Sequence, residues 1–284
     1  MEPNILRAII NLVNSPLTEV RDVSASHIRI NNVGESLERY VQNLFANTLD
    51  VESENKRLEI ISQNFSYVAN QNNPPDFILK NGDAIEVKKI ENQMSGLALN
   101  SSYPKAKLFS YDEMITAACR NCEEWMEKDL IYVVGFLDKS KLCSLCMVYG
   151  MDYAASAEIY ERIKSSIKGG VLQIPGVEFS ETRELGRVNK VDPLGITLLR
   201  VRGMWHIDNP LKVFDYIYQV DRSKNFNFMA LVNISKYQSF DERDRNELEQ
   251  MASVNNSLCI KNVKIKKPDN PAQLRDAKLI TFSI

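Results

Sequence analysis

The chain has 284 residues, with 44% hydrophobic and 25% charged side chains, which is the composition of an ordinary globular protein. This composition excludes a chain that is disordered throughout, and the length suits one large domain or two modest ones. The formal net charge of −2 does not indicate a partner class, because a nucleic-acid site depends on where positive charge gathers.

No segment of the sequence has the features of a membrane span or a signal peptide. The longest apolar run, residues 130–137, is far shorter than a bilayer-spanning helix. The N-terminus lacks the positive start and small-residue cleavage site of a signal peptide. We therefore expect a cytoplasmic protein without membrane contact, whose five cysteines are free thiols.

In the first half of the chain, hydrophobic periodicity predicts alternating helices and strands. Helices are expected at residues 5–13, 31–47, 110–125 and 154–167, the last ended by Gly169 and Gly170. A mixed segment at 58–68 leads into a hairpin that ends at residue 90, and paired strands are expected at 130–137 and 142–149.

The sequence pattern changes after residue 171, where short predicted strands alternate with loops up to residue 209. Further strands are expected at 213–220 and 226–232, a polar helix at 241–254, and a basic strand or loop at 262–267. We therefore expect an α/β fold, a central mixed β-sheet flanked by helices, with β-rich elaborations in the C-terminal half. A soft boundary near Gly170 divides the chain into 1–170 and 171–284, although both parts can form one domain.

The stretch PPDFILKNGDAIEVKK, residues 74–89, places charges in the middle of the predicted hairpin, where strands usually carry apolar residues. Glu86 and Lys88 share one face of its second strand. A two-residue loop at 81–82 would put Val87 opposite Asp76. A three-residue loop at 80–82, with its glycine left-handed, would put Glu86 there instead.

With the three-residue loop, the hairpin has the ligands of a metal site. Two carboxylates, Asp76 and Glu86, together with the backbone carbonyl of Val87, suit Mg²⁺, which prefers oxygen ligands. An ammonium such as that of Lys88 can orient water and stabilise charge on a phosphate. The alternative is a charged edge strand that prevents edge-to-edge pairing.

The same residues carry a resemblance to a known family. Pro75-Asp76, nine residues, and then Glu86-Val87-Lys88 resembles the PD-(D/E)xK nuclease signature. Longer segments, namely NGDAIEVKKIE, LALNSSYPKAKL, ACRNCEEW and GRVNKVDPLGITLLRVRGMW, resemble type II restriction endonucleases of the NgoPII type over most of the chain.

This resemblance implies a restriction-endonuclease-like core and Mg²⁺-dependent cleavage of double-stranded DNA by a homodimer, with Mn²⁺ as a substitute for Mg²⁺. The cut would fall at a short G/C-rich palindrome, suspected to be GGCC, and leave 5′-phosphate and 3′-hydroxyl ends. Residues 1–170 would hold the catalytic core and 171–284 the DNA-recognition elaboration packed on it.

The family pattern also implies roles for single residues. Asp76 and Glu86 would be metal ligands and Lys88 the catalytic lysine. Many PD-(D/E)xK nucleases take a further acid from a helix before the hairpin, and here Glu38 is preferred to Glu35. Both glutamates also suit an ordinary helix N-terminus, where the dipole favours acidic residues.

The segment from Arg183 to Arg202 has five positive and two negative residues in a chain of net charge −2. G·C base pairs need donors for guanine and acceptors for cytosine in the major groove. The alternative is a surface loop with an edge strand, or a solvated helix start for the two lysines at 105–107. We assign these residues to DNA contacts: Lys105, Lys107, Arg187, Asn189, Lys190, Asp192, Arg200 and Arg202.

Two CxxC pairs, Cys119 with Cys122 and Cys143 with Cys146, match a zinc pattern by spacing alone. In a strand, however, a separation of three puts the second pair on opposite faces. We therefore expect buried free thiols rather than structural zinc.

Two other functions are compatible with the sequence. One is a nuclease of the same fold that cuts by DNA shape, such as a junction resolvase or repair nuclease. The other is a non-enzymatic DNA- or zinc-binding module, in which the hairpin charges only support solubility.

Overall fold

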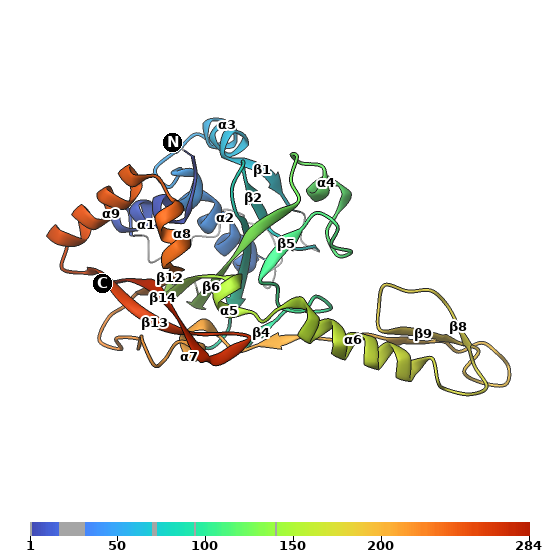
Figure 1. Cartoon of the computed structure of the whole chain (residues 1–284). Helices are drawn as coiled ribbons and strands as arrows, with labels where there is room; N and C mark the ends of the chain where they lie inside the picture. Colours follow the sequence, from blue (N-terminus) through green and yellow to red (C-terminus); the bar gives the residue numbers. More distant parts are fainter. Residues whose placement is uncertain (1, 17–31, 70–72, 94, 140) are drawn as a thin grey trace.

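The computed structural model describes residues 2–16, 32–69, 73–93, 95–139 and 141–284, with the side chains of 32–36 outside that description. The described residues form a mixed nine-stranded β-sheet flanked by helices, with a long arm projecting to one side (Figure 1). This confirms the expected α/β fold. None of the helices in the described part of the chain combines the length and hydropathy needed to span a bilayer.

The helices and strands have the following bounds. The helices are α1 (Ile5–Asn14), α2 (Asn32–Ala46), α3 (Glu54–Asn64), α4 (Ala117–Arg120), α5 (Gly150–Tyr153), α6 (Ala157–Val171), α7 (Pro210–Val213), α8 (Ile234–Ser239) and α9 (Glu242–Val254). The strands are β1 (Phe65–Val68), β2 (Phe77–Leu79), β3 (Ala84–Ile90), β4 (Leu97–Ala98), β5 (Lys107–Phe109), β6 (Glu127–Asp138), β7 (Lys141–Tyr149), β8 (Glu178–Phe179), β9 (Gly186–Asn189), β10 (Leu199–Val201), β11 (His206–Ile207), β12 (Asn227–Asn233), β13 (Leu258–Lys267) and β14 (Asn270–Ser283).

The main sheet has the strand order β1-β2-β3-β6-β7-β12-β14-β13, and β5 pairs with β6. β3 runs parallel to β6, and β7 runs parallel to β12. Strands β6 and β7 are neighbours, as expected of residues 130–137 and 142–149, and they run antiparallel. Alternate residues of the central strands enter two apolar layers, one under α1, α2 and α9 and the other under α5, α7 and the loops.

The hairpin of β2 and β3 has the three-residue loop. Phe77 pairs with Ile85 and Ile78 with Ala84, while the Leu79 amide donates to the Asp83 carbonyl at 2.9 Å. Continuing this register places Asp76 opposite Glu86. The prediction that the loop glycine is left-handed is wrong, because Asn81 and not Gly82 takes that conformation, with φ 55°. Asparagine tolerates it almost as well as glycine.

Four elements differ from the sequence-based expectation, and local polar contacts explain the first two. Residues 110–125 form only the short α4, since Asp112 folds back to accept the Phe109 amide at 3.0 Å. The strand expected at 213–220 is wrong, because α7, which Asn209 caps, ends at Val213 and turns follow it. α6 continues through Gly169 and Gly170 to Val171, and β14 is a strand that the sequence reading missed.

The arm, residues 157–204, consists of α6 and the three-stranded sheet β10-β9-β8 (Figure 1). After the arm the chain returns to the body, where β12, β14 and β13 complete the main sheet. The main sheet thus draws strands from both sides of the boundary expected near Gly170. The segment that departs from the body is the arm.

Candidate active site

The charged residues of the hairpin line a pocket of about 210 Å³. Asp76 lies at the start of β2, and Glu86 and Lys88 lie on one face of β3. The pocket is closed by the loop of residues 99–105 and by Tyr132 from β6. The hairpin therefore brings together the three residues that the sequence predicted to converge.

Asp76 is fixed by the backbone of the opposite strand. Its Oδ2 accepts the Val87 N–H at 2.6 Å. The N–H and C=O of one strand residue leave the same edge of the strand, so the Val87 carbonyl also points to the Asp76 edge. This orientation agrees with the prediction of a backbone oxygen beside the two carboxylates.

Glu86 and Lys88 are paired within the pocket. The Lys88 Nζ lies 2.5 Å from Glu86 Oε1. Glu86 is only 7% exposed, and its other oxygen, Oε2, is buried without a hydrogen-bond partner among the described residues. A buried carboxylate oxygen without a donor is costly, and such atoms often mark a missing ion or water.

Negative charge exceeds positive charge around these residues. Burial and then the charge of Glu86 raise the pKa of Asp76 well above its ordinary value, and Glu38 of α2 adds to this. Burial disfavours the ammonium of Lys88, but Glu86 and Asp76 outweigh it and raise the pKa of Lys88. Glu38 thus acts on the pocket electrostatically, whereas the side chain of Glu35 lies outside the described residues.

The donor set suits a divalent cation. Asp76, Glu86 and the Val87 carbonyl are hard oxygen donors, and the excess of carboxylate charge would be relieved by a cation. A search for at least three His, Cys, Asp or Glu side chains already gathered around one point finds none within the described ranges. A site of two carboxylates, one carbonyl and water agrees with that result, since Mg²⁺ keeps several waters.

Lys105 completes the opposite wall of the pocket. Its Nζ lies 2.8 Å from Asp112 Oδ1 and 4.9 Å from the centre of the Tyr103 ring. Its backbone N–H donates to the Tyr132 hydroxyl at 2.8 Å. Tyr132 and Asp112 were missed by the sequence analysis, because one lies within an apolar strand and the other within a segment expected to be helical.

Comparisons with known proteins identify the family of the chain. The sequence profile described as NgoPII restriction endonuclease matches residues 3–266. The chain belongs to the NgoPII restriction endonuclease family. It is 52% identical over 282 residues to the type II restriction enzyme NgoPII of Neisseria gonorrhoeae, covering 99% of this chain and 100% of that protein. No solved structure matches the chain significantly.

Membership in the NgoPII family confirms the resemblance seen in the sequence and makes the chain a type II restriction endonuclease. The mixed sheet flanked by helices is consistent with the restriction-endonuclease-like fold of such enzymes. The remaining predicted site residues of this family member lie outside the hairpin pocket.

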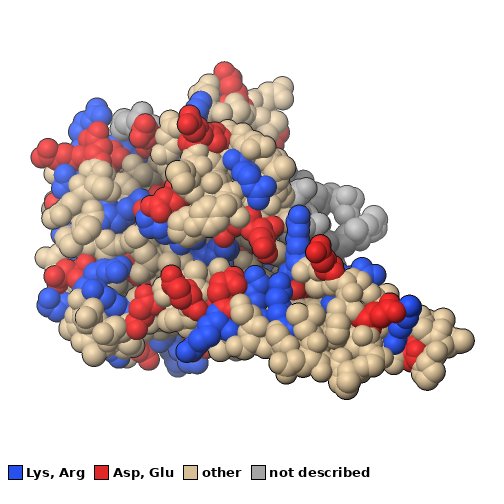
Figure 2. All heavy atoms as spheres, turned by 45° about the vertical axis from the view of Figure 1, so that its right-hand side comes forward, with Lys and Arg blue, Asp and Glu red and all other residues tan. Residues whose placement is uncertain are grey.

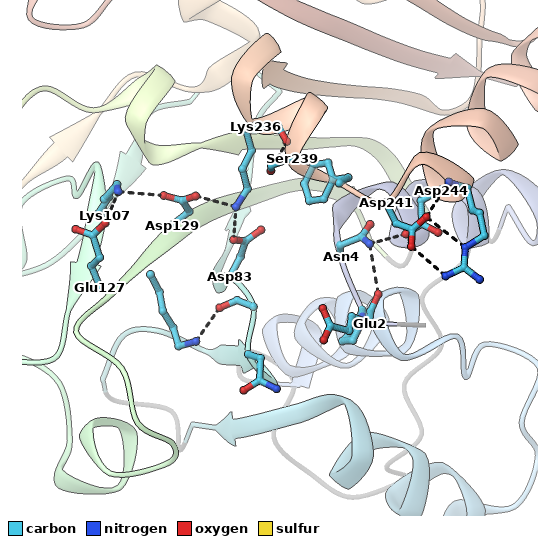
Figure 3. Close-up of a pocket in the computed structure, with 16 residues that line it drawn as sticks. Glu2, Asn4, Asp83, Lys107, Glu127, Asp129, Lys236, Ser239, Asp241 and Asp244 are labelled. Atoms are coloured by element: carbon cyan, nitrogen blue, oxygen red, sulfur yellow. Dashed lines mark hydrogen bonds and ion pairs between the residues drawn. The ribbon is translucent and has the colours of Figure 1, made fainter.

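Lys107 is two residues from Lys105 but belongs to a different pocket. It lies 2.6 Å from Glu127 and lines a larger cavity of about 720 Å³ at the loop end of the hairpin (Figure 3). At the centre of this cavity, Lys236 bridges Asp83 and Asp129 at 2.7 Å each. Lys105 and Lys107, both assigned to DNA contacts from the sequence, thus line different pockets.

The predicted base-reading residues all lie on the arm. Arg187 and Asn189 are on β9, where Arg187 lies opposite Arg200 of β10. Arg200 and Arg202 share one face, because both bind Glu184 at 2.6 Å.

Two further predicted residues lie at the turn after β9. Lys190 binds Glu178 at 2.6 Å. Asp192 accepts the Thr197 amide at 2.7 Å and thereby shapes the arm tip. Lys190, Arg200 and Arg202 are therefore exposed but held by acidic partners in the free protein.

The two CxxC pairs lie in different parts of the structure. Cys143 and Cys146 occupy β7, where their spacing puts them on opposite faces, and Cys146 is buried. Cys119 is buried in α4, and burial raises the pKa of its thiol to about 12. All five cysteines are free thiols.

Proposed function

We propose that this chain is a Mg²⁺-dependent type II restriction endonuclease that cuts double-stranded DNA at a short G/C-rich palindrome, GGCC. The observation that carries the proposal is the convergence of Asp76, Glu86 and Lys88 in one pocket with surplus carboxylate charge. Family membership supports restriction activity, and the hard oxygen donors support Mg²⁺, which Mn²⁺ can replace.

Within the pocket, each side chain has a role that follows from its position. Bound Mg²⁺ would supply a Lewis acid for the scissile phosphate. Asp76, Glu86 and the Val87 carbonyl would hold it, and Glu38 would add negative charge from α2. Lys88, kept protonated by its neighbours, would orient the attacking water and stabilise charge on the phosphate.

DNA binding involves both the pocket wall and the arm. Lys105 faces the pocket and would contact a phosphate beside the cut, whereas Lys107 would contact DNA only from the larger cavity. The arm cations Arg187, Arg200 and Arg202, with Asn189, Lys190 and Asp192, would contact bases and phosphates of the site.

The arm is joined to the pocket through aromatic packing. Tyr103 of the pocket wall stacks on Tyr160 of α6, with ring centres 5.2 Å apart, and both rings meet the edge of Trp205. The Leu99 amide also donates to the Trp205 carbonyl at 2.8 Å. DNA held by the arm would therefore lie next to the pocket, which supports a recognition part within 171–284 beside a catalytic part within 1–170.

A palindrome has two equivalent strands to cut, so we propose a two-fold homodimer in which each subunit cuts one strand. We also propose that the enzyme acts in the cytoplasm.

The decisive experiment is digestion of unmethylated phage DNA with Mg²⁺, followed by sequencing of the fragment ends. Discrete fragments whose ends all derive from GGCC would support both the activity and the specificity. Cuts that follow DNA shape without one sequence would favour a structure-specific nuclease. No cutting with Mg²⁺ or Mn²⁺, combined with retained DNA or stoichiometric zinc binding, would favour a non-enzymatic module.

A further inference from the structure

The pocket lies between two walls that come from different parts of the chain. One wall is the hairpin with its carboxylates and Lys88, and the other is the loop of residues 99–105. Figure 2 shows charged side chains dense on the body and sparse on the projecting arm in that view. The contacts that join the arm to the loop wall are correspondingly aromatic and backbone contacts, such as the stack of Tyr103 on Tyr160.

Tyr132 of β6 lies on the sheet directly beside Glu86. The two residues are partners in the parallel pairing of β3 with β6, so their side chains share one face of the sheet. The hairpin register places Asp76 on the other side of Glu86. Tyr132 is only 3% exposed, and its ring packs edge-on against Tyr153 with 5.5 Å between ring centres. The phenol is therefore a fixed neighbour of the two carboxylates.

The hydroxyl of Tyr132 holds the loop wall through both backbone groups of one residue. It accepts the Lys105 N–H at 2.8 Å and donates to the Lys105 carbonyl at 3.3 Å. Burial raises the pKa of Tyr132, so the hydroxyl keeps its proton and can donate and accept at once. The loop also lies tightly against the start of α5, since a Cβ on Gly150 would overlap the carbonyl oxygens of Lys105 and Ala106.

The other end of the loop is fixed to the chain that returns from the arm. The Leu99 amide donates to the Trp205 carbonyl, and the Trp205 amide donates to the Asn100 carbonyl, each at 2.8 Å. The loop thus connects the arm to the sheet, and Tyr132 is its attachment beside the carboxylates. A shift of the loop at this attachment would move Lys105 relative to Glu86.

We propose that Tyr132 is a positioning residue for DNA cleavage, which acts by fixing Lys105 relative to Glu86. The inference rests on the proposed function, because it takes Lys105 as a phosphate contact and Glu86 as a metal ligand. Misplacing reacting groups by about 1 Å costs on the order of 10²-fold in rate. Tyr132 acts through the loop and needs no contact of its own with DNA, so its loss should slow the cut and spare DNA affinity.

The test compares Tyr132→Phe with Tyr153→Phe, since each variant removes only a hydroxyl. Both hydroxyls bind backbone, that of Tyr153 by donating to the Asp208 carbonyl, and both rings belong to the same apolar layer. Only Tyr132 lines the pocket. The two variants are therefore matched in the kind of contact they lose, and they differ in whether that contact holds the loop wall.

We expect Tyr132→Phe to lower the single-turnover cleavage rate by about 10²-fold, because Lys105 is then misplaced. The DNA dissociation constant, measured without Mg²⁺, should stay close to that of the wild type. Tyr153→Phe should cut at nearly the wild-type rate. Equal losses of rate in the two variants would mean that both tyrosines serve only the stability of the layer, and would overturn the positioning role.

Hydrogen exchange tests the attachment without relying on activity. Residues 99–105 should exchange faster in Tyr132→Phe than in the wild type, because the Lys105 N–H has lost its acceptor. Tyr153→Phe should leave their exchange unchanged. Unchanged protection in Tyr132→Phe would show that the hydroxyl does not hold the loop, and the inference would be wrong.

A second variant moves the same loop without touching Tyr132. Gly150→Ala places a methyl group against the Lys105 carbonyl, so the loop must shift. It should slow cleavage while DNA affinity persists, which keeps the inference testable even if Tyr132→Phe does not fold. A folded Gly150→Ala chain that cuts at the wild-type rate would show that the position of the loop does not limit cleavage.

A double-mutant cycle tests whether Tyr132 acts through Lys105. If it does, Tyr132→Phe combined with Lys105→Ala should be no slower than the slower single variant, because the two changes remove one and the same contribution. Losses that multiply would mean that the two residues act independently. The Mg²⁺ concentration for half-maximal rate should stay at its wild-type value in Tyr132→Phe. A marked rise would mean that Tyr132 orients the metal ligand Glu86 and not the loop.

Failure of this inference differs from failure of the proposed function. A wild type that cuts DNA at the same rate as Tyr132→Phe would overturn the positioning role and leave the proposed function in place. Cleavage at a sequence other than GGCC would correct the specificity and leave the positioning role in place. A wild type that cuts no DNA with Mg²⁺ or Mn²⁺ would remove the proposed function, and the positioning role with it.

Discussion

The two ends of the β2–β3 hairpin carry acidic clusters of similar composition. A lysine balances the carboxylates at one end, whereas carboxylate charge is in surplus at the other. At the loop end, Lys236 lies 2.7 Å from both Asp83 and Asp129 (Figure 3). The Tyr149 hydroxyl also donates to Asp83 at 2.7 Å. At the open end, Asp76 and Glu86 share Lys88 while Glu38 adds further negative charge.

The pKa shifts of the two aspartates have different causes. Burial raises the pKa of Asp83, but Lys236 opposes the shift. Burial also raises the pKa of Asp76, and there the strongest neighbouring charge, that of Glu86, adds to the shift instead of opposing it. The loop-end cluster therefore needs no further cation, whereas the open-end cluster needs one.

This difference matters for recognising a site. The larger cavity is the balanced one, at about 720 Å³ against about 210 Å³. Cavity size alone would thus select the structural cluster. The smaller pocket is selected instead by its surplus carboxylate charge and by the raised pKa of Asp76. Glu86 Oε2, which has no hydrogen-bond partner among the described residues, points to the same pocket, because catalytic sites keep charges that the fold itself leaves unsatisfied.

The largest expected effect is the difference in cleavage rate between variants of Lys88 and of Lys236. Lys88→Ala should lower the cleavage rate by about 10³-fold or more, because it removes the positive charge that stabilises the transition state. DNA binding should persist. Lys236→Met should cut at nearly the wild-type rate under conditions where it is folded. Cleavage rates under single-turnover conditions check this.

A control comes from the same strand. Lys89 follows Lys88 on β3 and is exposed rather than in the pocket. Lys89→Ala should therefore keep its activity. Wild-type rates in Lys88→Ala would remove the catalytic assignment, and a large loss in Lys89→Ala would show that the strand, and not the pocket charge, sets the rate.

The second prediction concerns the contribution of Lys236 to the stability of the folded protein. Lys236→Met should lower the free energy of unfolding by about 3–5 kcal/mol, because it leaves two largely buried carboxylates without their cation. Urea unfolding measures the change. Adding Asp83→Asn and Asp129→Asn to Lys236→Met should recover part of the loss, since the uncompensated charges are then removed. A cost below about 1 kcal/mol for Lys236→Met would mean that the bridge is solvated.

The sequence predicted the open-end cluster but not the loop-end cluster, and the reason is chain distance. Asp76, Glu86 and Lys88 lie within one hairpin, where the period of two and the loop length determine which side chains meet. Lys236 lies 107 residues beyond Asp129 in the chain. The parallel pairing of β7 with β12 brings α8 to this end of the sheet, and no local sequence pattern predicts that pairing.

The same reason explains the failures in the fold. The expected helix at 110–125 gave way to turns because Asp112 binds the Lys105 side chain and the Phe109 amide. Such side chain-to-backbone contacts are invisible to hydrophobic periodicity. Strongly periodic elements, such as β6 and α1, were predicted with nearly their true bounds because burial of an apolar face decides them.

The third prediction concerns metal binding to the unbalanced cluster. Mg²⁺ should stabilise the wild type by about 2.7 kcal/mol at a hundredfold excess over its Kd, because it binds the folded state only. Asp76→Asn should lose most of this gain, and Asp83→Asn should keep it. Thermal unfolding with and without Mg²⁺, in the absence of DNA, provides the measurement. An equal gain in Asp76→Asn would place the ion elsewhere.

The smallest expected effect is the pH dependence of stability without metal. Because the folded-state pKa of Asp76 is raised, the folded protein holds a proton that the unfolded chain has released. The stabilisation is therefore complete below the unfolded pKa of about 4 and is lost as pH rises through the folded pKa, at a slope of at most about 1.4 kcal/mol per pH unit. The free-energy difference between wild type and Asp76→Asn, measured in EDTA from pH 4 to pH 8, should fall accordingly. With Mg²⁺ present this fall should shrink, since the ion replaces the proton as the partner of the carboxylate. A difference that is flat in EDTA would mean that Asp76 is already ionised in the metal-free pocket, and that Lys88 alone balances the cluster.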